Sequence, residues 1–191
     1  MKDIRLCEDQ TYTAINFEQS NELCEEYENC VFEQCSFANT DLSRKKFIDC
    51  SFEACNFTGA DLHESILRDV VFQGCKLLGL RFDHCNKFGF SARFDGCNLD
   101  LADFTGMGLK KSSFQGCRLH SAVFTNADLK EAVFNNSDLS SAIFEHTNLE
   151  KADFTGSVNI VLDPGINNLK GAKIPMTELP GLLYMHQIKV V

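Results

Sequence analysis

The chain has 191 residues, the size of one domain with at most a small appendage. Its formal net charge of −9 argues against direct DNA binding, because an acidic surface repels phosphates. No stretch approaches 18 consecutive apolar residues, which argues against a membrane-spanning helix, and the charged start MKDIRLCEDQ is unlike a signal peptide. We therefore expect a cytoplasmic protein, in which ten cysteines need an explanation other than a disulfide framework.

The N-terminal third, residues 1–60, is the most acidic part of the chain. It contains 12 acidic and 5 basic residues, whereas residues 61–160 contain 13 acidic and 10 basic ones. Residues 1–26, which precede the repeat described next, are assigned to an N-terminal acidic coil or cap.

A period of five residues follows and continues to Phe154. Every fifth residue is Phe or Leu from Phe32 to Phe82, and again from Phe94 to Phe154, which makes 24 positions without an exception. This period fits neither a straight helix nor a straight strand, because successive side chains would face different directions. A coil with four sides of five residues returns each of these side chains, called anchors below, to the interior.

The residue two positions before each anchor is small. Ala, Cys, Ser or Thr occupies most of these positions. A large anchor beside a small inward residue fills a narrow interior without voids, and a free cysteine behaves as a small buried hydrophobe. Seven cysteines occupy this position and Cys85 is expected to be an eighth, so we predict a packing role for them.

The anchor frame shifts by two residues within residues 83–93. If two residues loop out there, anchors four repeat units apart stack on one side, and one side carries only Phe. Phe88 and Phe90 lie off the frame, so either one of them replaces an anchor or the segment is a protruding contact loop. The candidate loop residues are Asn86, Lys87, Phe88 and Phe90.

The last segment, residues 159–191, is predicted to be a cap and dimerisation segment. Thr177 is a candidate N-cap of a short helix with Pro180 in its first turn, and residues 188–191 resemble a strand. An open end of such a stack of coils exposes apolar anchors, so the tail either covers its own coils or pairs with a second copy. The candidate contact residues are Leu179, Leu182, Leu183, Tyr184, Met185, Ile188 and Val190.

The repeat resembles the pentapeptide-repeat family, whose unit is roughly Ala-(Asp/Asn)-Leu-X-X. The unit occurs here as Ala60-Asp61-Leu62, Ala102-Asp103-Phe104, Ala127-Asp128-Leu129 and Ala152-Asp153-Phe154. The resemblance covers about residues 27–158 and implies an all-β fold, a right-handed quadrilateral β-helix, with a short C-terminal helix or strand cap. Residues 162–167, followed by Ile174 and the terminal valines, resemble the quinolone-resistance members and the related immunity proteins against topoisomerase poisons.

Chemical motifs of enzymes are missing from the sequence. It contains no nucleotide-binding glycine motif, no nucleophile motif, no zinc-protease motif and no CxxC pair, and its five histidines are scattered. We therefore expect no enzyme activity, no catalytic residue, no cofactor and no metal site.

Acidic residues concentrate on the third side of the expected coil. An aspartate before the anchor is part of the family unit, and charge also keeps a rod soluble. Alternatively, a row of carboxylates imitates nucleic-acid phosphates and attracts the basic groove of a DNA-binding protein. This acidic stripe consists of Asp41, Asp61, Glu64, Asp83, Asp103 and Glu145.

The resemblance implies a non-enzymatic DNA mimic that binds DNA gyrase or topoisomerase IV and protects it from quinolones or related poisons. It also implies a homodimer formed through the C-terminal segment, with no direct contact to nucleic acid. Longer members of the subgroup carry a projecting loop needed for protection, whereas the break here is only two residues. Binding without protection, inhibition of the topoisomerase, and an interaction scaffold for an unrelated protein are therefore alternatives.

Overall fold

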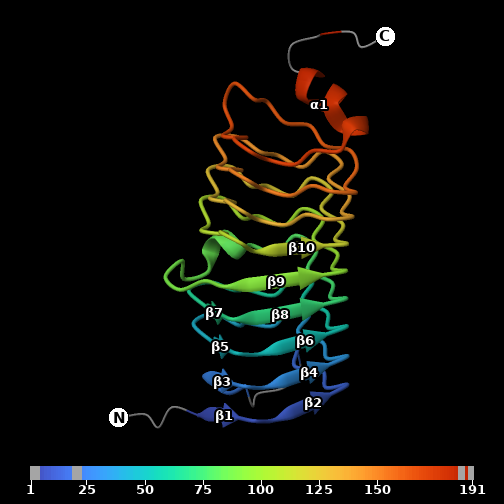
Figure 1. The fold of residues 1–191 in the computed structure, drawn as a ribbon. Helices are drawn as coiled ribbons and strands as arrows, with labels where there is room; N and C mark the ends of the chain where they lie inside the picture. Colours follow the sequence, from blue (N-terminus) through green and yellow to red (C-terminus); the bar gives the residue numbers. More distant parts are fainter. Residues whose placement is uncertain (1–4, 19–22, 185–187, 189–191) are drawn as a thin grey trace.

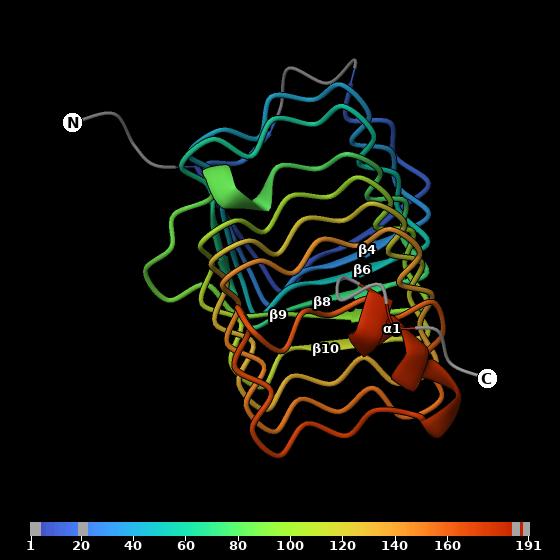
Figure 2. The ribbon, with the colours of Figure 1, turned by 90° about the horizontal axis from the view of Figure 1, so that it is seen from above.

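The computed structural model describes residues 5–18, 23–184 and 188. The chain winds into a right-handed four-sided β-helix whose strands are all parallel (Figures 1 and 2). Two sides are regular enough to form sheets, and the other two are held by single bridges between successive coils. One sheet has the order β1 (Leu6–Glu8), β3 (Glu26–Glu28), β5 (Lys46–Ile48), β7 (Ile66–Arg68); the other has the order β10 (Ser113–Gln115), β9 (Ala92–Asp95), β8 (Val70–Gln73), β6 (Ser51–Glu53), β4 (Val31–Glu33), β2 (Thr11–Thr13).

The register confirms the predicted break of two residues. Phe32 lies opposite Phe52, four repeat units further along the chain, whereas the step from Phe72 to its partner Phe94 is two residues longer. The all-Phe side is therefore continuous and is prolonged downward by Tyr12. Neighbouring rings in it are stacked with centroids 4.7–5.4 Å apart: Tyr12, Phe32, Phe52, Phe72, Phe94, Phe114, Phe134 and Phe154.

The inward cysteines are buried thiols, as predicted, but they also act as donors. Most of them donate to a carbonyl of the coil below: Cys50 Sγ, for example, donates to the carbonyl oxygens of Tyr27 and Ile48 at 3.4 and 3.3 Å, whereas Cys85 Sγ accepts the Ser65 hydroxyl at 3.4 Å. The Ser137 hydroxyl makes the equivalent bond to the Phe114 carbonyl. The eight free and buried thiols are Cys30, Cys35, Cys50, Cys55, Cys75, Cys85, Cys97 and Cys117.

The other two cysteines, Cys7 and Cys24, form a disulfide between the first coil and the second. The packing role predicted for the other eight cysteines did not include this pair. Cys7 lies in β1, the edge strand of its sheet at the end of the rod, and no coil of the described residues lies below it. The bond ties this end coil to the next one.

The ladder of parallel pairs extends beyond the boundaries expected at residues 27 and 158. β1 and β2 already pair with β3 and β4, and the bridges Asn148–Asn168 and Asp153–Lys173 continue the coil at the other end. Residues 5–18 and 23–26 therefore belong to a coil of the same β-helix.

The C-terminal end carries the 3₁₀ turn η2 (Met176–Glu178) and the helix α1 (Leu179–Leu183) (Figure 1). The predicted N-cap, Thr177, lies in η2, and the helix begins one residue later with Glu178 as its N-cap. Pro180 lies in the first turn, where proline is tolerated, and this fixes the start. No helix among the described residues is long and apolar enough to cross a membrane.

Helix α1 is held closely against the last coil. Glu178 Oε2 accepts the Ile160 N–H at 2.9 Å, and a Cβ on Gly181 would lie only 1.7 Å from the Ile160 carbonyl oxygen. Gly181, which weakens the helix as an isolated segment, is therefore required for this contact. Leu182 packs against the core from α1.

Candidate protein-binding surface

The structure interrupts the acidic stripe predicted on the third side. Asp41 and Asp61 lie opposite each other on neighbouring coils, but the bridging partner of Asp103 in the coil below is Arg81. The residues above Asp103 at this position are Val123 and Ile143. The six stripe residues therefore do not form one continuous row of carboxylates.

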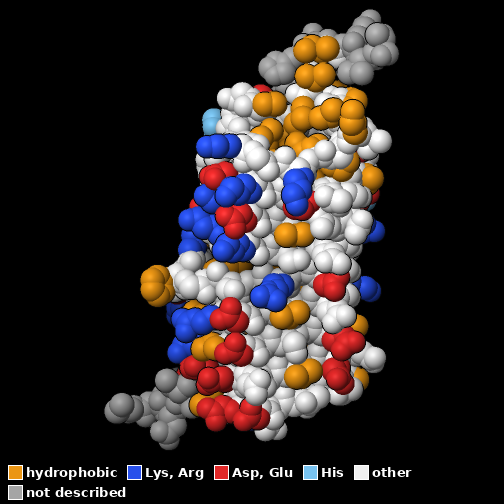
Figure 3. Space-filling model, in the orientation of Figure 1, with side chains coloured by type: hydrophobic (Ala, Val, Ile, Leu, Met, Phe, Trp, Pro, Cys, Tyr) orange, Lys and Arg blue, Asp and Glu red, His pale blue; other side chains and the backbone are white. Residues whose placement is uncertain are grey.

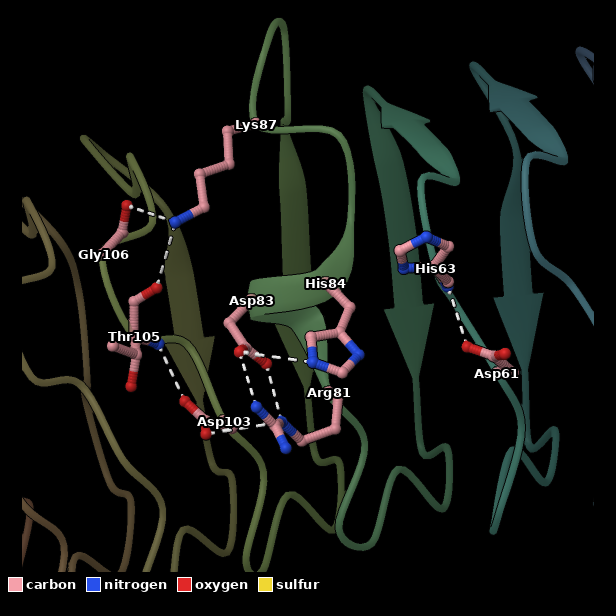
Figure 4. A network of polar contacts seen from close by, with 9 residues as sticks. All are labelled: Asp61, His63, Arg81, Asp83, His84, Lys87, Asp103, Thr105 and Gly106. Atoms are coloured by element: carbon pink, nitrogen blue, oxygen red, sulfur yellow. Dashed lines mark hydrogen bonds and ion pairs between the residues drawn. The ribbon is translucent and has the colours of Figure 1, made fainter.

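Arg81 neutralises the middle of the stripe. Its guanidinium lies 2.7 Å from Asp83 and 3.4 Å from Asp103, measured to their Oδ2 atoms (Figure 4). Burial alone would raise the pKa of Asp83, but Arg81 holds that pKa below its usual value. Both carboxylates are thus paired with one guanidinium, and they offer little net charge to a partner.

The stripe residues on the N-terminal coils are held by hydrogen bonds and an ion pair with neighbouring residues. The Asp41 and Asp61 side chains accept the N–H groups of Ser43 and His63, both at 2.9 Å. The hydrogen bonds from Ser43 lower the pKa of Asp41, so it is ionised at neutral pH. Glu64 is in an ion pair with Arg44 at 2.9 Å.

Glu145 lies apart from the other stripe residues. It is exposed on a coil of the C-terminal half, and Asp103 is the nearest stripe residue along the third side. No ion pair involves it among the described residues.

Further acidic residues, which the sequence analysis missed, lie in register on the other sides of the N-terminal coils. Glu8 lies opposite Glu28, and Glu33 lies opposite Glu53. Each pair is separated by four repeat units in the sequence, and this spacing alone predicts that the two carboxylates face each other on neighbouring coils. We define the acidic end as the three in-register pairs of carboxylates, Glu8 and Glu28, Glu33 and Glu53, and Asp41 and Asp61.

The charge distribution differs between the two halves of the rod. Acidic side chains gather over the N-terminal coils, and lysines and arginines over the coils above them (Figure 3). In the upper half many acidic residues are paired with a base on a neighbouring coil. These pairs are Arg118–Asp100 (2.6 Å), Lys110–Asp128 (3.1 Å), Lys130–Glu150 (3.1 Å) and Lys173–Asp153 (2.7 Å).

The loop at the break contains one half-buried and one exposed phenylalanine. Phe90 is half-buried, with its ring 6.2 Å from that of Phe82, whereas Phe88 is 85% exposed. Phe90 thus packs inward, and Phe88 protrudes, while a contact role of the loop stays a prediction. Asn86 accepts the Phe88 N–H at 2.9 Å, and Lys87 Nζ donates to the carbonyls of residues 105 and 106 (Figure 4), so both polar residues brace the loop.

The C-terminal end presents an apolar surface (Figure 3). Leu182 and Leu183 are half-buried, whereas Leu179, Tyr184 and Ile188 are exposed. The predicted contact residues Met185 and Val190 lie outside the described residues. Exposed apolar residues that the sequence analysis did not name extend this surface: Val158, Val161, Ile166 and Met176.

The described residues offer no arrangement for metal chemistry. Among them, no group of three His, Cys, Asp or Glu side chains is placed to hold an ion. His120 lies between two carboxylates, with Nε2 2.9 Å from Asp138 Oδ2 and Nδ1 3.9 Å from Asp100 Oδ1. These contacts link neighbouring coils.

Comparisons with known proteins agree with this geometry. A family model described as "Pentapeptide repeat region" matches residues 25–87 and 45–116, and one described as "Pentapeptide repeats (8 copies)" matches residues 117–156. Two trypsin-treated forms of QnrB1, described as a plasmid-mediated fluoroquinolone resistance protein, have similar structures. The first has a TM-score of 0.62 at 22% identity, covering 98% of each chain. The second has a TM-score of 0.61 at 20% identity, covering 98% of this chain and 99% of that one. No curated protein sequence matches this chain.

Proposed function

Because this chain belongs to the pentapeptide-repeat family, we propose that it is a non-enzymatic protein that binds a type II topoisomerase in place of DNA. We propose further that it protects DNA gyrase or topoisomerase IV from quinolones or related poisons. The likeness to QnrB1 is one of fold, and the partner and the poison class are taken from it by analogy.

The observation that carries the proposal is the acidic end. None of its six carboxylates forms an ion pair with a described residue. Three of them, Glu28, Glu33 and Asp41, lie within one coil on three different sides. The six carboxylates span three coils, so with a rise of about 4.8 Å per coil they average one charge per about 2.4 Å of rod, compared with about 1.7 Å for duplex DNA.

Stacking like charges has a cost in stability. Carboxylates directly opposite each other on paired strands repel, whereas an alternation with lysine would stabilise the same surface. The upper half of the rod has that alternation in its Lys–Glu and Lys–Asp pairs. The absence of such pairing at the acidic end, among the described residues, is the pattern expected of a surface that steers toward a basic partner.

A charge-neutralised variant tests the acidic end. We expect the changes Glu33→Gln, Glu53→Gln, Asp41→Asn and Asp61→Asn together to weaken binding to gyrase or topoisomerase IV at least about tenfold, because the field that guides association is removed. Asn can still accept the N–H two residues ahead, so the fold is retained. The measurement is binding by surface plasmon resonance, with supercoiling by gyrase in the presence and absence of a fluoroquinolone.

The matched control removes four carboxylates from the upper half. It carries Asp128→Asn, Glu131→Gln, Glu150→Gln and Asp153→Asn, which changes the net charge equally and breaks only surface ion pairs of small energetic value. This control is expected to bind as the native chain does. Equal binding by both variants would refute the role of the acidic end.

The supercoiling assay also separates the alternatives. Rescue of supercoiling in the presence of the drug supports protection, and inhibition without rescue supports DNA mimicry in another role. No effect on either topoisomerase would overturn the proposal and leave a scaffold for an unrelated partner.

We also propose a homodimer formed through the C-terminal apolar surface. Met176 is 84% and Tyr184 70% exposed, and they lie in η2 and directly after α1, the helix at the C-terminal end of the rod (Figure 2). We expect Met176→Glu with Tyr184→Glu to give a monomer by light scattering after size exclusion, because burying two charges at this interface is unfavourable. Phe88→Glu, at the loop, is the control and should leave the mass unchanged. A native chain that is monomeric at high micromolar concentration would contradict the proposal.

A further inference from the structure

The fourth side of the rod, which carries β1, β3, β5 and β7, is interrupted at the loop of residues 86–90. After β7 the chain leaves the side, and the ladder resumes with the bridge between Gly108 and Asp128 (Figure 1). Elsewhere on this side the N–H at the equivalent position is paired with the coil below. The N–H of Ile66 donates to Lys45 O at 2.9 Å, and that of Asp128 to Met107 O at 2.9 Å. Gly108 N–H has no such acceptor among the described residues.

A second N–H is unpaired at the same place. In the coils above, the side chain before the anchor accepts the N–H two residues ahead: Asp128 accepts from Lys130 at 3.3 Å and Asn148 from Glu150 at 3.2 Å. Gly108 has no side chain, and a Cβ built on it would meet nothing within 4 Å. Lys110 N–H therefore has no acceptor among the described residues, and the space of the missing carboxylate is open.

Basic side chains surround this space. It is a hollow of about 170 Å³ lined by Arg93, Lys110 and Lys111 together with Ser91 and Ser112, and no acidic residue lines it. Lys110 and Lys111 are held from above by Asp128 and Glu131 at 3.1 and 3.8 Å. Arg93 is exposed and forms no ion pair with a described residue. It also borders two adjoining hollows, of about 200 and 330 Å³.

We propose that this hollow is a binding site for a phosphate oxyanion. The oxygens of the anion take the place that the carboxylate of Asp128 takes in the next coil, and accept the N–H groups of Gly108 and Lys110. Arg93 supplies a guanidinium that can bind two phosphate oxygens at once, and Lys111 adds a second positive charge. The phosphate is either free or part of a nucleic-acid backbone, and the site does not depend on the proposed topoisomerase partner.

Two substitutions at one position test the site. Gly108→Asp supplies an internal carboxylate that fills the space and repels the anion, whereas Gly108→Ala leaves the space and both N–H groups in place. We expect saturable binding of inorganic phosphate by the native chain in calorimetry at low salt, retention of it in Gly108→Ala, and its loss in Gly108→Asp. Thermal unfolding of both variants, expected at or above the native midpoint, establishes that they fold.

Arg93→Gln is expected to weaken phosphate binding at least about tenfold, since a charge-assisted hydrogen bond is lost. Lys170→Gln, on the same side but outside the hollow, is the control and should bind as the native chain does. A 12-base-pair DNA duplex is titrated in parallel to identify the source of the phosphate. If the duplex binds more tightly than inorganic phosphate and its binding depends equally on Gly108 and Arg93, the ligand is a backbone phosphate. If only inorganic phosphate binds, the ligand is a free anion. The proposal is overturned if neither probe saturates, or if Gly108→Asp and Arg93→Gln bind as the native chain does.

Discussion

Replacement of Phe94 by alanine is expected to lower the free energy of unfolding by about 3–5 kcal/mol, the usual range for truncation of a buried phenylalanine. The Phe94 side chain is fully buried, and its ring stacks on those of Phe72 and Phe114 with centroids 5.4 and 5.1 Å away. It also makes edge contacts with Phe82 and Phe104. The substitution removes all four ring contacts at the middle of the rod, just above the break.

The effect is expected to be large because each coil contacts only its neighbours. A cavity at the middle weakens the coupling between the two halves, as in other repeat proteins whose stability depends on interfaces between adjacent units. Urea unfolding followed by circular dichroism measures the change. Phe88→Ala is the control, since this ring is exposed on the loop and its loss should change stability by less than about 0.5 kcal/mol. Equal stability of the two variants would contradict the stacked core.

The core of the rod could be predicted because the buried positions recur every five residues along the sequence. Each anchor faces the same interior, so the same residue types return every five positions, and the shift between Phe82 and Phe94 fixes the number of inserted residues. The N-terminal coil, assigned from the sequence to an acidic coil or cap, has Tyr12, Phe17 and Tyr27 at its anchor positions. Because two of these residues are tyrosines, the period of Phe and Leu does not show that the β-helix already begins there.

The charged surface was harder to predict, because the total charge of one side does not show which residues face each other. Arg81 precedes the anchor Phe82 and bridges to Asp103, so a base interrupts the row of carboxylates. Ion pairs such as that of Arg81 with Asp103 also depend on side-chain direction, which the repeat does not specify. The spacing of four repeat units therefore predicts that Asp41 lies beside Asp61, but it does not predict which carboxylates lack an ion pair.

Raising the pH into the alkaline range is expected to lower the free energy of unfolding substantially, because the buried thiols are then forced to ionise. Burial raises the pKa of the Cys50 and Cys85 thiols to about 12, whereas a thiol in the unfolded chain has a pKa of about 8.5. Since the folded value is the higher one, the stabilisation is complete below about pH 8.5 and is lost as the pH rises toward 12. Each thiol then lowers the free energy of unfolding by about 1.4 kcal/mol per pH unit.

Between pH 7.5 and 10.5 these two thiols together should reduce the stability by about 5 kcal/mol. The measurement is the urea midpoint at both pH values, without oxygen and with the Cys7–Cys24 disulfide intact.

A Cys50→Ser and Cys85→Ser variant provides the comparison, because a serine hydroxyl does not titrate in this range. A serine at position 50 can donate to the same backbone carbonyls as the Cys50 thiol, as Ser137 does to Phe114, and a serine at position 85 can accept the Ser65 hydroxyl as the Cys85 thiol does. The variant should lose clearly less stability than the native chain over this interval. An equal loss in both proteins would mean that the two thiols do not set the alkaline limit, and that their packing role alone explains why cysteines occupy the interior.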